Sequence, residues 1–267
     1  MSERKLFLKK IYLSEVEREK LKSPAQVSEP ITEKDIAHLP EPVQKYFRVC
    51  GYIGKAKMLW TYLDWKNTGI RLGLAKKWIN MECLQFNSVT EPSRIVYMKS
   101  NLFGIFPFEG RDKFLDGHGN MFIKLLKVFT VADAKGSEMD KSALVTVLAE
   151  ALIVPAYALQ KYIAWQPVDE KTARASLSFN GCTVSGIFHF NNAGEFIRFE
   201  TNDRYYSEKG NEYQNIKWSI KADNYIESGG VKFPSDLKAI WNFDDGDYEY
   251  FKGAITNIRL GYPNLFD

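Results

Sequence analysis

Glu150 is the residue of this sequence whose setting comes closest to that of a catalytic acid or base. It is the only acidic residue between Lys141 and Lys161, and it lies in the apolar run 144–152. Burial raises the pKa of a carboxyl group, so an acid buried in such a run can hold or accept a proton during a reaction. On a helical wheel, however, Glu150 lies off the apolar stripe and beside Thr146 and Lys161. This placement favours a carboxylate on the flank of a helix, near solvent.

Two pairs of adjacent charged residues are the other candidates for catalysis, Arg111-Asp112 and Asp203-Arg204. Neighbouring side chains of a strand point to opposite faces of the sheet, so neither pair can converge on one substrate atom without a bulge. Ion pairs across neighbouring strands are the favoured interpretation. A hydrolase hypothesis therefore combines Glu150 with a nearby Arg111 or Arg204.

The three histidines do not have the spacing of metal ligands. His38, His118 and His189 each lack a second ligand two, three or four residues away, and they read as surface or turn residues. The acidic run 244–247 lacks the alternating ligands and the terminal glutamate of a calcium loop, so a hairpin turn is expected there. Motifs for nucleotides, zinc proteases and serine nucleophiles are also absent. The sequence predicts no metal and no cofactor.

Composition and charge are those of a packed protein without a nucleic-acid footprint. The 36 basic and 33 acidic residues are interspersed and leave a net charge of +3, so no basic stripe is available for a phosphate backbone. Aromatic residues make up 14% of the chain, a surplus that favours half-buried sheet surfaces and a thick core or lined cavity.

Cysteine usage and the N-terminus predict a reducing compartment. Cys50, Cys83 and Cys182 lie far apart and form no CxxC motif, so they are expected to be reduced, mostly buried thiols. The apolar run 6–8 is too short for a signal peptide, and no window reaches the length of a transmembrane span. We expect a soluble, cytoplasmic protein that meets membranes only peripherally, or through a segment that this sequence does not contain.

The first half of the chain changes from helical to strand-like patterns near residue 55. A helix is expected over 1–22, a linker over 23–30, and a short helix that begins near Pro40 and ends at Gly51. Alternating apolar residues then predict strands near 55–63, 77–86, 93–100, 103–109 and 111–115, whereas the period of 121–131 is ambiguous.

A long apolar helix over 138–164 separates two groups of strands. Pro155 should bend or split this helix, and Trp165-Gln166-Pro167 should end it. Beyond residue 170 the chain reads as a meander, with Asn180-Gly181 predicting a type I′ hairpin. We therefore predict an N-terminal helix and linker over 1–38 and a single domain over 39–267. The fold class is mainly β (α+β), a curved antiparallel sheet or half-barrel of about eleven strands with a helix on one face.

Several short patterns together resemble a bacterial family known only as a domain of unknown function. They are Leu39-Pro-x-Pro-Val-Gln-x-Tyr46, Leu148-Ala-Glu-Ala-x3-Pro-x2-Ala-Leu159, Trp165-x3-Asp-x2-Thr-Ala173, Ser185-Gly-x-Phe-x-Phe-Asn-x2-Gly-Glu195 and Asp203-Arg-Tyr205. The resemblance covers about residues 39–260 and implies no activity. The family pattern often places an arginine one turn before the helix glutamate, where this chain has Thr146, so the resemblance implies no Arg–Glu pair within this helix. Some members begin with membrane-spanning segments.

The order of the elements is also similar to that of LolA/LolB-type lipoprotein carriers. That resemblance implies an open half-barrel whose concave face is covered by helices and holds acyl chains, as an analogy of architecture alone.

Three hypotheses about function follow. The first is non-catalytic binding of a lipid or another apolar small ligand between the sheet and the apolar helix. The second is the hydrolase that uses Glu150, and the third is a scaffold or assembly module that pairs through an exposed apolar patch. The side chains expected to meet a ligand are Glu150, Tyr157, Trp165, Asp203 and Arg204.

Overall fold

One antiparallel sheet carries most of the chain. The computed structural model describes residues 8–22, 29–73, 77–102, 105–126, 128–208 and 212–261. Its helices are α1 (Leu8–Leu21), α2 (Glu33–Ile36), α3 (Glu41–Val49) and α4 (Ser137–Ala149), and a 3₁₀ turn spans Tyr157–Leu159. Its strands are β1 (Trp60–Ile70), β2 (Ile79–Ser88), β3 (Ser93–Leu102), β4 (Phe106–Leu115), β5 (His118–Leu125), β6 (Phe129–Ala134), β7 (Ile163–Asp169), β8 (Thr172–Phe179), β9 (Cys182–Phe190), β10 (Phe196–Thr201), β11 (Tyr205–Tyr206), β12 (Gln214–Asn215), β13 (Lys217–Ser228), β14 (Val231–Phe243) and β15 (Gly246–Gly261).

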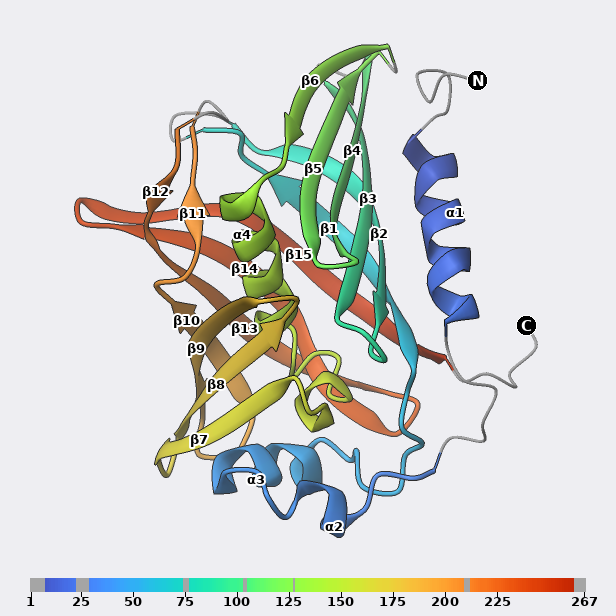
Figure 1. Cartoon of the computed structure of the whole chain (residues 1–267). Coiled ribbons are helices and arrows are strands. Elements are labelled where there is room, and N and C mark those ends of the chain that lie inside the picture. The colour runs from blue at the N-terminus through green and yellow to red at the C-terminus, as the bar shows by residue number, and fades with distance from the viewer. Residues whose placement is uncertain are drawn as a thin grey trace.

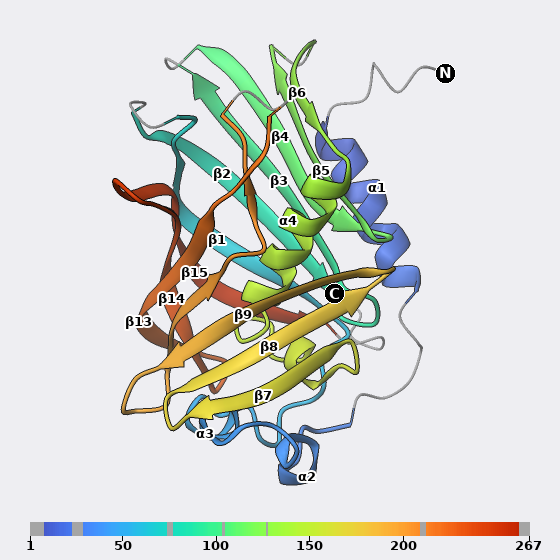
Figure 2. The same cartoon turned by 60° about the vertical axis from the view of Figure 1, so that its left-hand side comes forward.

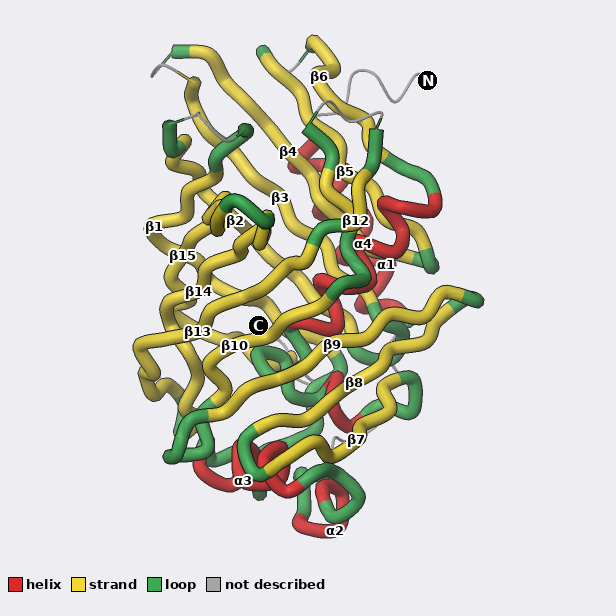
Figure 3. The backbone as a smooth tube through the Cα atoms, turned by 90° about the vertical axis from the view of Figure 1, so that its left-hand side faces the viewer, coloured by secondary structure: helices red, strands yellow, loops and turns green. Residues whose placement is uncertain are grey.

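The sheet is open, with a different strand at each edge. Thirteen strands pair in the order β6-β5-β4-β3-β2-β1-β15-β14-β13-β10-β9-β8-β7, and β11 and β12 form a separate two-stranded ribbon. Figure 3 follows the stack from β1 through β15 and β14 down to β7. The sheet curves strongly, so that its two ends rise on either side of α4 (Figures 1 and 2). The predicted class, a curved antiparallel sheet with a helix on one face, is confirmed.

The sheet of the described residues has thirteen strands where about eleven were expected, and some strand boundaries also differ. The runs 103–109 and 111–115 were expected as two strands, but 106–115 form the single strand β4. The ambiguous segment 121–131 divides between β5 and β6. Asn180 and Gly181 have φ values of 47° and 75°, which confirms the predicted type I′ turn between β8 and β9.

The predicted helix over 138–164 is shorter than expected, because it ends at Ala149. Glu150 is its C-cap, and the backbone N–H groups of Ile153 and Val154 donate to the Glu150 carbonyl as the chain turns over. Residues 151–158 are all buried, so their continuous apolar character reflects burial and not helical packing. Residues 163–169, expected at the end of the helix, form β7.

Helix α4 and the buried turns after it cover part of the inner face of the sheet. The buried core joins Leu144 and Leu148 of α4 to Phe188 and Phe199 of the strands. Helix α3 closes the lower end, where the Tyr46 hydroxyl donates to the Leu152 carbonyl at 2.5 Å (Figure 1). Helix α3 ends at Val49 and is followed by Gly51 with φ 73°, close to the predicted end of that helix.

Helix α1 packs on the opposite, outer face of the sheet, against β2, β3 and β4 (Figure 1). Its buried residues share one side of the helix and are Leu8, Tyr12, Val16 and Glu19. Of the helix predicted over 1–22, residues 1–7 lie outside the described residues, as do residues 23–28 of the expected linker. No helix of the described chain is both long and apolar enough to cross a membrane.

Close packing of α4 on β5 depends on the absence of a side chain at Gly119. A Cβ atom there would lie 2.3 Å from the Met139 carbonyl oxygen and 2.8 Å from the Ala143 Cβ. We expect Gly119→Ala to push α4 outward and to destabilise the protein by about 1–3 kcal/mol, measured by urea denaturation. If Gly119→Ala left stability unchanged, the close contact between α4 and β5 would be wrong.

Candidate functional site

The carboxylate of Glu150 lies at the centre of a buried polar network on the inner face of the sheet. Its Oε2 accepts from Gln85 Nε2 at 2.8 Å and from Asn87 Nδ2 at 2.9 Å, and its Oε1 accepts from Arg94 Nε at 2.8 Å. Arg94 NH1 donates in turn to Asp112 Oδ2 at 2.7 Å. We call these five residues the Glu150 network. The expectation that Glu150 lies near solvent is wrong.

Strand register explains why these side chains meet. Asn87 is paired with Arg94 across β2 and β3, and Asp112 is paired with Val96 across β3 and β4. Residues two apart on a strand share a face, so Gln85 lies on the same inner face as Asn87. Glu150 reaches them because the chain leaves α4 at this residue.

The network changes from fully buried to partly exposed along its length. Glu150, Gln85 and Asn87 are buried, whereas the side chains of Arg94 and Asp112 are 14% and 20% exposed. Burial by itself lowers the pKa of the Arg94 guanidinium, but the two carboxylates raise it above its ordinary value. The arginine therefore stays charged and binds both acids at once.

The hydrogen bonds of the Glu150 carboxylate favour a structural role over that of a general base. A general base needs an oxygen free to accept a proton from a substrate. Both oxygens of Glu150 instead accept hydrogen bonds from buried donors, one of them a guanidinium. Charge-assisted hydrogen bonds of this kind fix the orientation of a carboxylate.

Neither arginine predicted to assist Glu150 contacts it. Arg111 is on the outer face, where it pairs with Glu15 of α1 at 3.3 Å. Arg204 is on the inner side but one helical turn away, where NH1 donates to the Thr146 hydroxyl and the guanidinium lies 4.3 Å from the centre of the Trp218 ring. The partner of Glu150 is Arg94, and Arg204 supplies an arginine beside Thr146 from a distant part of the chain.

The other predicted ligand-binding residues have structural partners in this fold. Asp203 accepts from the Ser185 backbone N–H at 2.8 Å and pairs with Lys141 of α4 at 3.0 Å. The buried Tyr157 hydroxyl donates to the Ser93 carbonyl at 2.7 Å, and burial raises its pKa. Trp165 Nε1 donates to the Ala158 carbonyl at 3.0 Å. Tyr157 lies beside the Glu150 network, because Ser93 precedes Arg94 on β3.

Asp112 and Arg111 do point to opposite faces, as the alternation of strand side chains predicts. Asp112 forms its ion pair with Arg94 on the neighbouring strand, so the cross-strand interpretation is confirmed for Asp112. It is wrong for Arg111, whose acidic partner belongs to α1, and for Asp203, whose cationic partner belongs to α4.

An apolar cluster borders the network on the same inner face. Its buried residues are Met81, Cys83, Val96 and Met98, and the partly buried side chains of Trp65, Ile70, Met121 and Phe251 pack against them. We call these eight residues the inner apolar cluster. Trp65 Nε1 donates to Gln85 Oε1 at 3.2 Å, so the cluster and the network are in direct contact.

The described cysteines and histidines do not form a reactive cluster at this site. Burial raises the pKa of the Cys83 thiol to about 12, which keeps it protonated and unreactive. The cysteines are free, with Cys50 and Cys83 buried, as predicted. His38 and His118 are exposed, and His189 lies 3.5 Å from Glu200. Within the described ranges, histidines, cysteines and acids form no cluster that could hold a metal.

Three hollows lie elsewhere on the molecule. The first, of about 630 Å³, is lined by residues of α2 and of the 156–160 segment, among them Asp35 and Lys57. The others, of about 520 and 700 Å³, are lined mainly by polar and charged residues of strand ends and turns. These hollows combine mixed charge with open walls, and none of them includes Glu150.

Sequence reasoning identified Glu150 but missed Arg94, Gln85 and Asn87. The one available signal was alternation: Gln85 lies on the expected strand 77–86, Asn87 is two residues further on and just past its expected end, and Arg94 follows a turn signal at 91–93. Pairing these two strands as a hairpin would have brought the three side chains to one face.

The comparison with solved structures finds a LolA superfamily protein, NE2245 from Nitrosomonas europaea. It is similar to this chain with a TM-score of 0.44 and 11% sequence identity, over 82% of this chain and 94% of that one. A search among curated proteins finds no match. Residues 29–253 match the family described as "Family of unknown function (DUF6544)". Because this match spans far more than half of the chain, the protein belongs to the DUF6544 family.

Proposed function

We propose that this protein binds a small amphipathic ligand, such as a fatty acid, on the inner face of its sheet without transforming it. The apolar part of the ligand lies on the inner apolar cluster, and its polar end lies toward Arg94 and Asp112. The observation that carries this proposal is the direct contact between a partly exposed cluster of methionine and aromatic side chains and a charged network. Binding sites for small molecules typically combine apolar walls with a few fixed polar groups.

The residue types in the cluster support an adaptable apolar surface. Met81, Met98 and Met121 bring flexible, polarizable side chains to β2, β3 and β5, and methionine adjusts to ligands of different shape. Trp65 and Phe251 add flat surface, with ring centres 5.6 Å apart.

Rigid support for the polar end comes from the Glu150 network. Arg94 is fixed by Glu150 on one side and Asp112 on the other, so little side-chain entropy is lost when it contacts a ligand. Glu150 thereby positions the arginine and does not itself contact the ligand. The saturated hydrogen bonding of its carboxylate favours this positioning role over the hydrolase hypothesis.

Native mass spectrometry of the purified protein, followed by denaturation and organic extraction, tests the proposal directly. A reproducible adduct in the lipid mass range supports it and identifies the class of ligand. The proposal would be contradicted if several expression hosts gave only apo protein and the protein also failed to bind dansyl-undecanoic acid.

A charge placed in the inner apolar cluster should abolish binding without unfolding the protein. We expect Met121→Glu to weaken binding of dansyl-undecanoic acid by roughly tenfold or more, because the partly buried wall would then carry an unpaired charge. The measurement is the rise of dansyl fluorescence during a titration. Leu84→Glu is the matched control, because Leu84 is 39% exposed on the outer face of β2 and should bind like the wild type. Equal loss in both variants would place the ligand elsewhere.

A further inference from the structure

Exposed apolar side chains are concentrated at one end of the sheet. Six of the fourteen large apolar side chains that are exposed among the described residues belong to the β3–β4 turn, the β5–β6 turn and the edge strand β6. They are Ile105, Phe106, Leu126, Val128, Phe129 and Val131, with exposures from 38% to 71%. We call these six residues the rim.

The residues of the rim are neighbours in space. The Leu126 backbone N–H donates to the Pro107 carbonyl at 2.7 Å, which joins the two turns. Phe129 is paired with Leu125 across β5 and β6. Both turns lie at the upper end of the molecule in Figures 1 and 2. A contiguous apolar surface on projecting turns calls for a partner, because soluble proteins seldom leave such surfaces in water.

We propose that the rim docks on the surface of a phospholipid bilayer. The six side chains of the rim enter the interface between headgroups and acyl chains, and the rest of the described protein stays in water. This contact does not use a membrane-spanning helix, since none of the described helices is long and apolar enough to cross a membrane. The docking is peripheral.

Aromatic and cationic residues beside the rim fit this partner better than they fit a second copy of the chain. At the same end of the sheet, Trp78 lies close to two cations, with the Arg71 guanidinium 4.4 Å and Lys252 Nζ 4.6 Å from its ring centre. Tryptophan is enriched at the depth of lipid headgroups, and cations close to a bilayer are attracted to anionic lipids. The basic residue Lys77 next to Trp78 is exposed.

The rim is also continuous with the proposed binding surface. Strands β2, β3 and β5 carry Met81, Met98 and Met121 of the inner apolar cluster, and β3 and β5 run directly into the two turns of the rim. A docked rim would therefore place the inner face next to the source of an acyl ligand. This last step rests on the proposed function, whereas docking itself rests on the rim alone.

Flotation with extruded vesicles tests the docking. Wild-type protein should float with phosphatidylcholine vesicles, and more strongly when phosphatidylglycerol is included at low salt. We expect Val128→Asp with Val131→Asp to lower vesicle binding by roughly tenfold, because two aspartates would have to lose water to enter the interface. Both positions are at least 60% exposed, so the fold should persist, as circular dichroism can check.

The matched control is Val168→Asp, because Val168 is 53% exposed on β7, the other edge strand of the sheet. It should float like the wild type. No flotation of the wild type with either vesicle, or equal loss in the control, would overturn the proposal. A dimer in light scattering that the rim variant converts to a monomer, without vesicle binding, would assign the rim to a second copy and would also overturn it.

The same variants separate docking from ligand binding. In the absence of vesicles, the rim variant should titrate with dansyl-undecanoic acid like the wild type, because the rim lies outside the inner apolar cluster. Failure of flotation with intact ligand binding contradicts the docking alone. Failure of ligand binding with intact flotation contradicts the proposed function alone.

Discussion

Replacing Arg94 with methionine should destabilise the protein by roughly 3–5 kcal/mol, because the substitution leaves two acids of the Glu150 network without their cation. Glu150 is buried, so it cannot recover its lost partner from water. Methionine keeps much of the volume of the arginine stem, so the loss reports the charge and not a cavity. The free energy of unfolding in urea is the measurement, with the midpoint and slope compared between variants.

A surface arginine gives the matched comparison. Arg259 pairs with Asp64 at 2.8 Å, but its side chain is 54% exposed. We expect Arg259→Met to cost less than about 1 kcal/mol, as exposed ion pairs usually do. If the two substitutions cost the same, the Glu150 network would not be buried in solution.

A double variant separates the pair from its surroundings. Glu150→Gln alone keeps the shape but leaves an amide beside a buried guanidinium, and it should also destabilise the protein. When combined with Arg94→Met, the Glu150→Gln substitution should cost less than it does alone, because the two residues interact directly. Additive losses would show that Arg94 and Glu150 do not interact in solution.

Sequence patterns predicted the fold well and the side-chain contacts poorly. The strands follow from local patterns, whereas the contacts depend on how distant strands pair. Alternation of apolar residues is local, so the strands and the type I′ turn at Asn180-Gly181 could be predicted. The partner of Glu150 depends on which strand pairs with which, and in what register. The sequence analysis paired Glu150 with Arg111 or Arg204, yet the arginine that contacts it is Arg94, and Arg111 lies on the outer face.

Burial on every side also made the secondary structure of one segment ambiguous from sequence. A segment that is buried on every side reads as apolar whether it is a helix or a series of turns, so the expected helix over 138–164 extended past its end at Ala149. The placement of Glu150 near solvent had the same origin, because the wheel assumed a helix that continues beyond it. The boundary expected between residues 38 and 39 stays a prediction.

Helix α1 should detach from the sheet when a charge is placed on its buried side. Val16 is 1% exposed and packs in the cluster that includes Tyr12, Phe86, Ile95 and Leu115. We expect Val16→Asp to destabilise the protein by at least about 3 kcal/mol, because an unpaired carboxylate would be buried among apolar groups. Leu13→Asp is the control on the same helix, where Leu13 is 47% exposed, and it should stay within about 0.5 kcal/mol of the wild type.

Hydrogen exchange distinguishes detachment of α1 from global unfolding. In Val16→Asp, the amides of residues 8–21 should exchange fast while those of β13 and β14 stay protected. The bared outer face, which includes Phe86 and Ile95, should then bind an apolar dye and promote aggregation. Slow exchange of α1 in both variants would contradict the packing of this helix.

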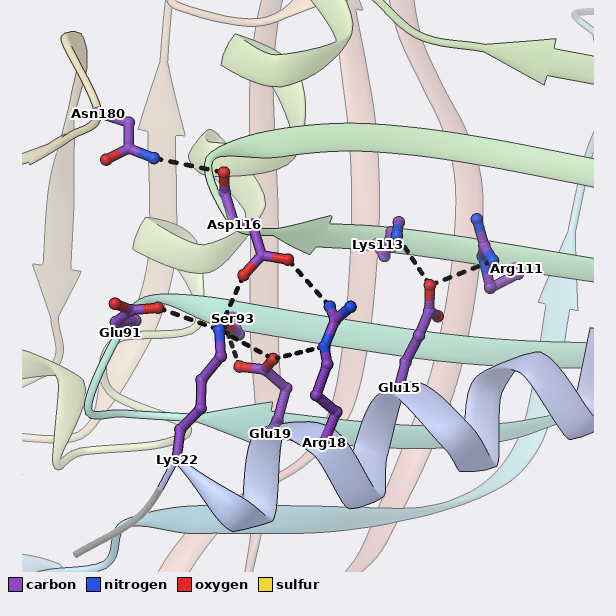
Figure 4. Close-up of polar contacts among 10 residues, drawn as sticks. All are labelled: Glu15, Arg18, Glu19, Lys22, Glu91, Ser93, Arg111, Lys113, Asp116 and Asn180. Carbon is purple, nitrogen blue, oxygen red and sulfur yellow. Dashed lines mark hydrogen bonds and ion pairs between the residues drawn. The ribbon is translucent and has the colours of Figure 1, made fainter.

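The polar contacts of α1 are numerous, but they should not keep the helix on the sheet in Val16→Asp. Arg18 of α1 and Lys22, just after its last residue, pair with Asp116 at 2.9 and 2.8 Å, and Glu15 of α1 pairs with Lys113 (Figure 4). Asp116 is half exposed, so each of its two pairs, with Arg18 and with Lys22, contributes about 0–1 kcal/mol. Asp116→Asn should therefore cost far less than Val16→Asp in the same urea experiment. If Asp116→Asn cost more, charge pairs and not apolar burial would hold α1 on the outer face of the sheet.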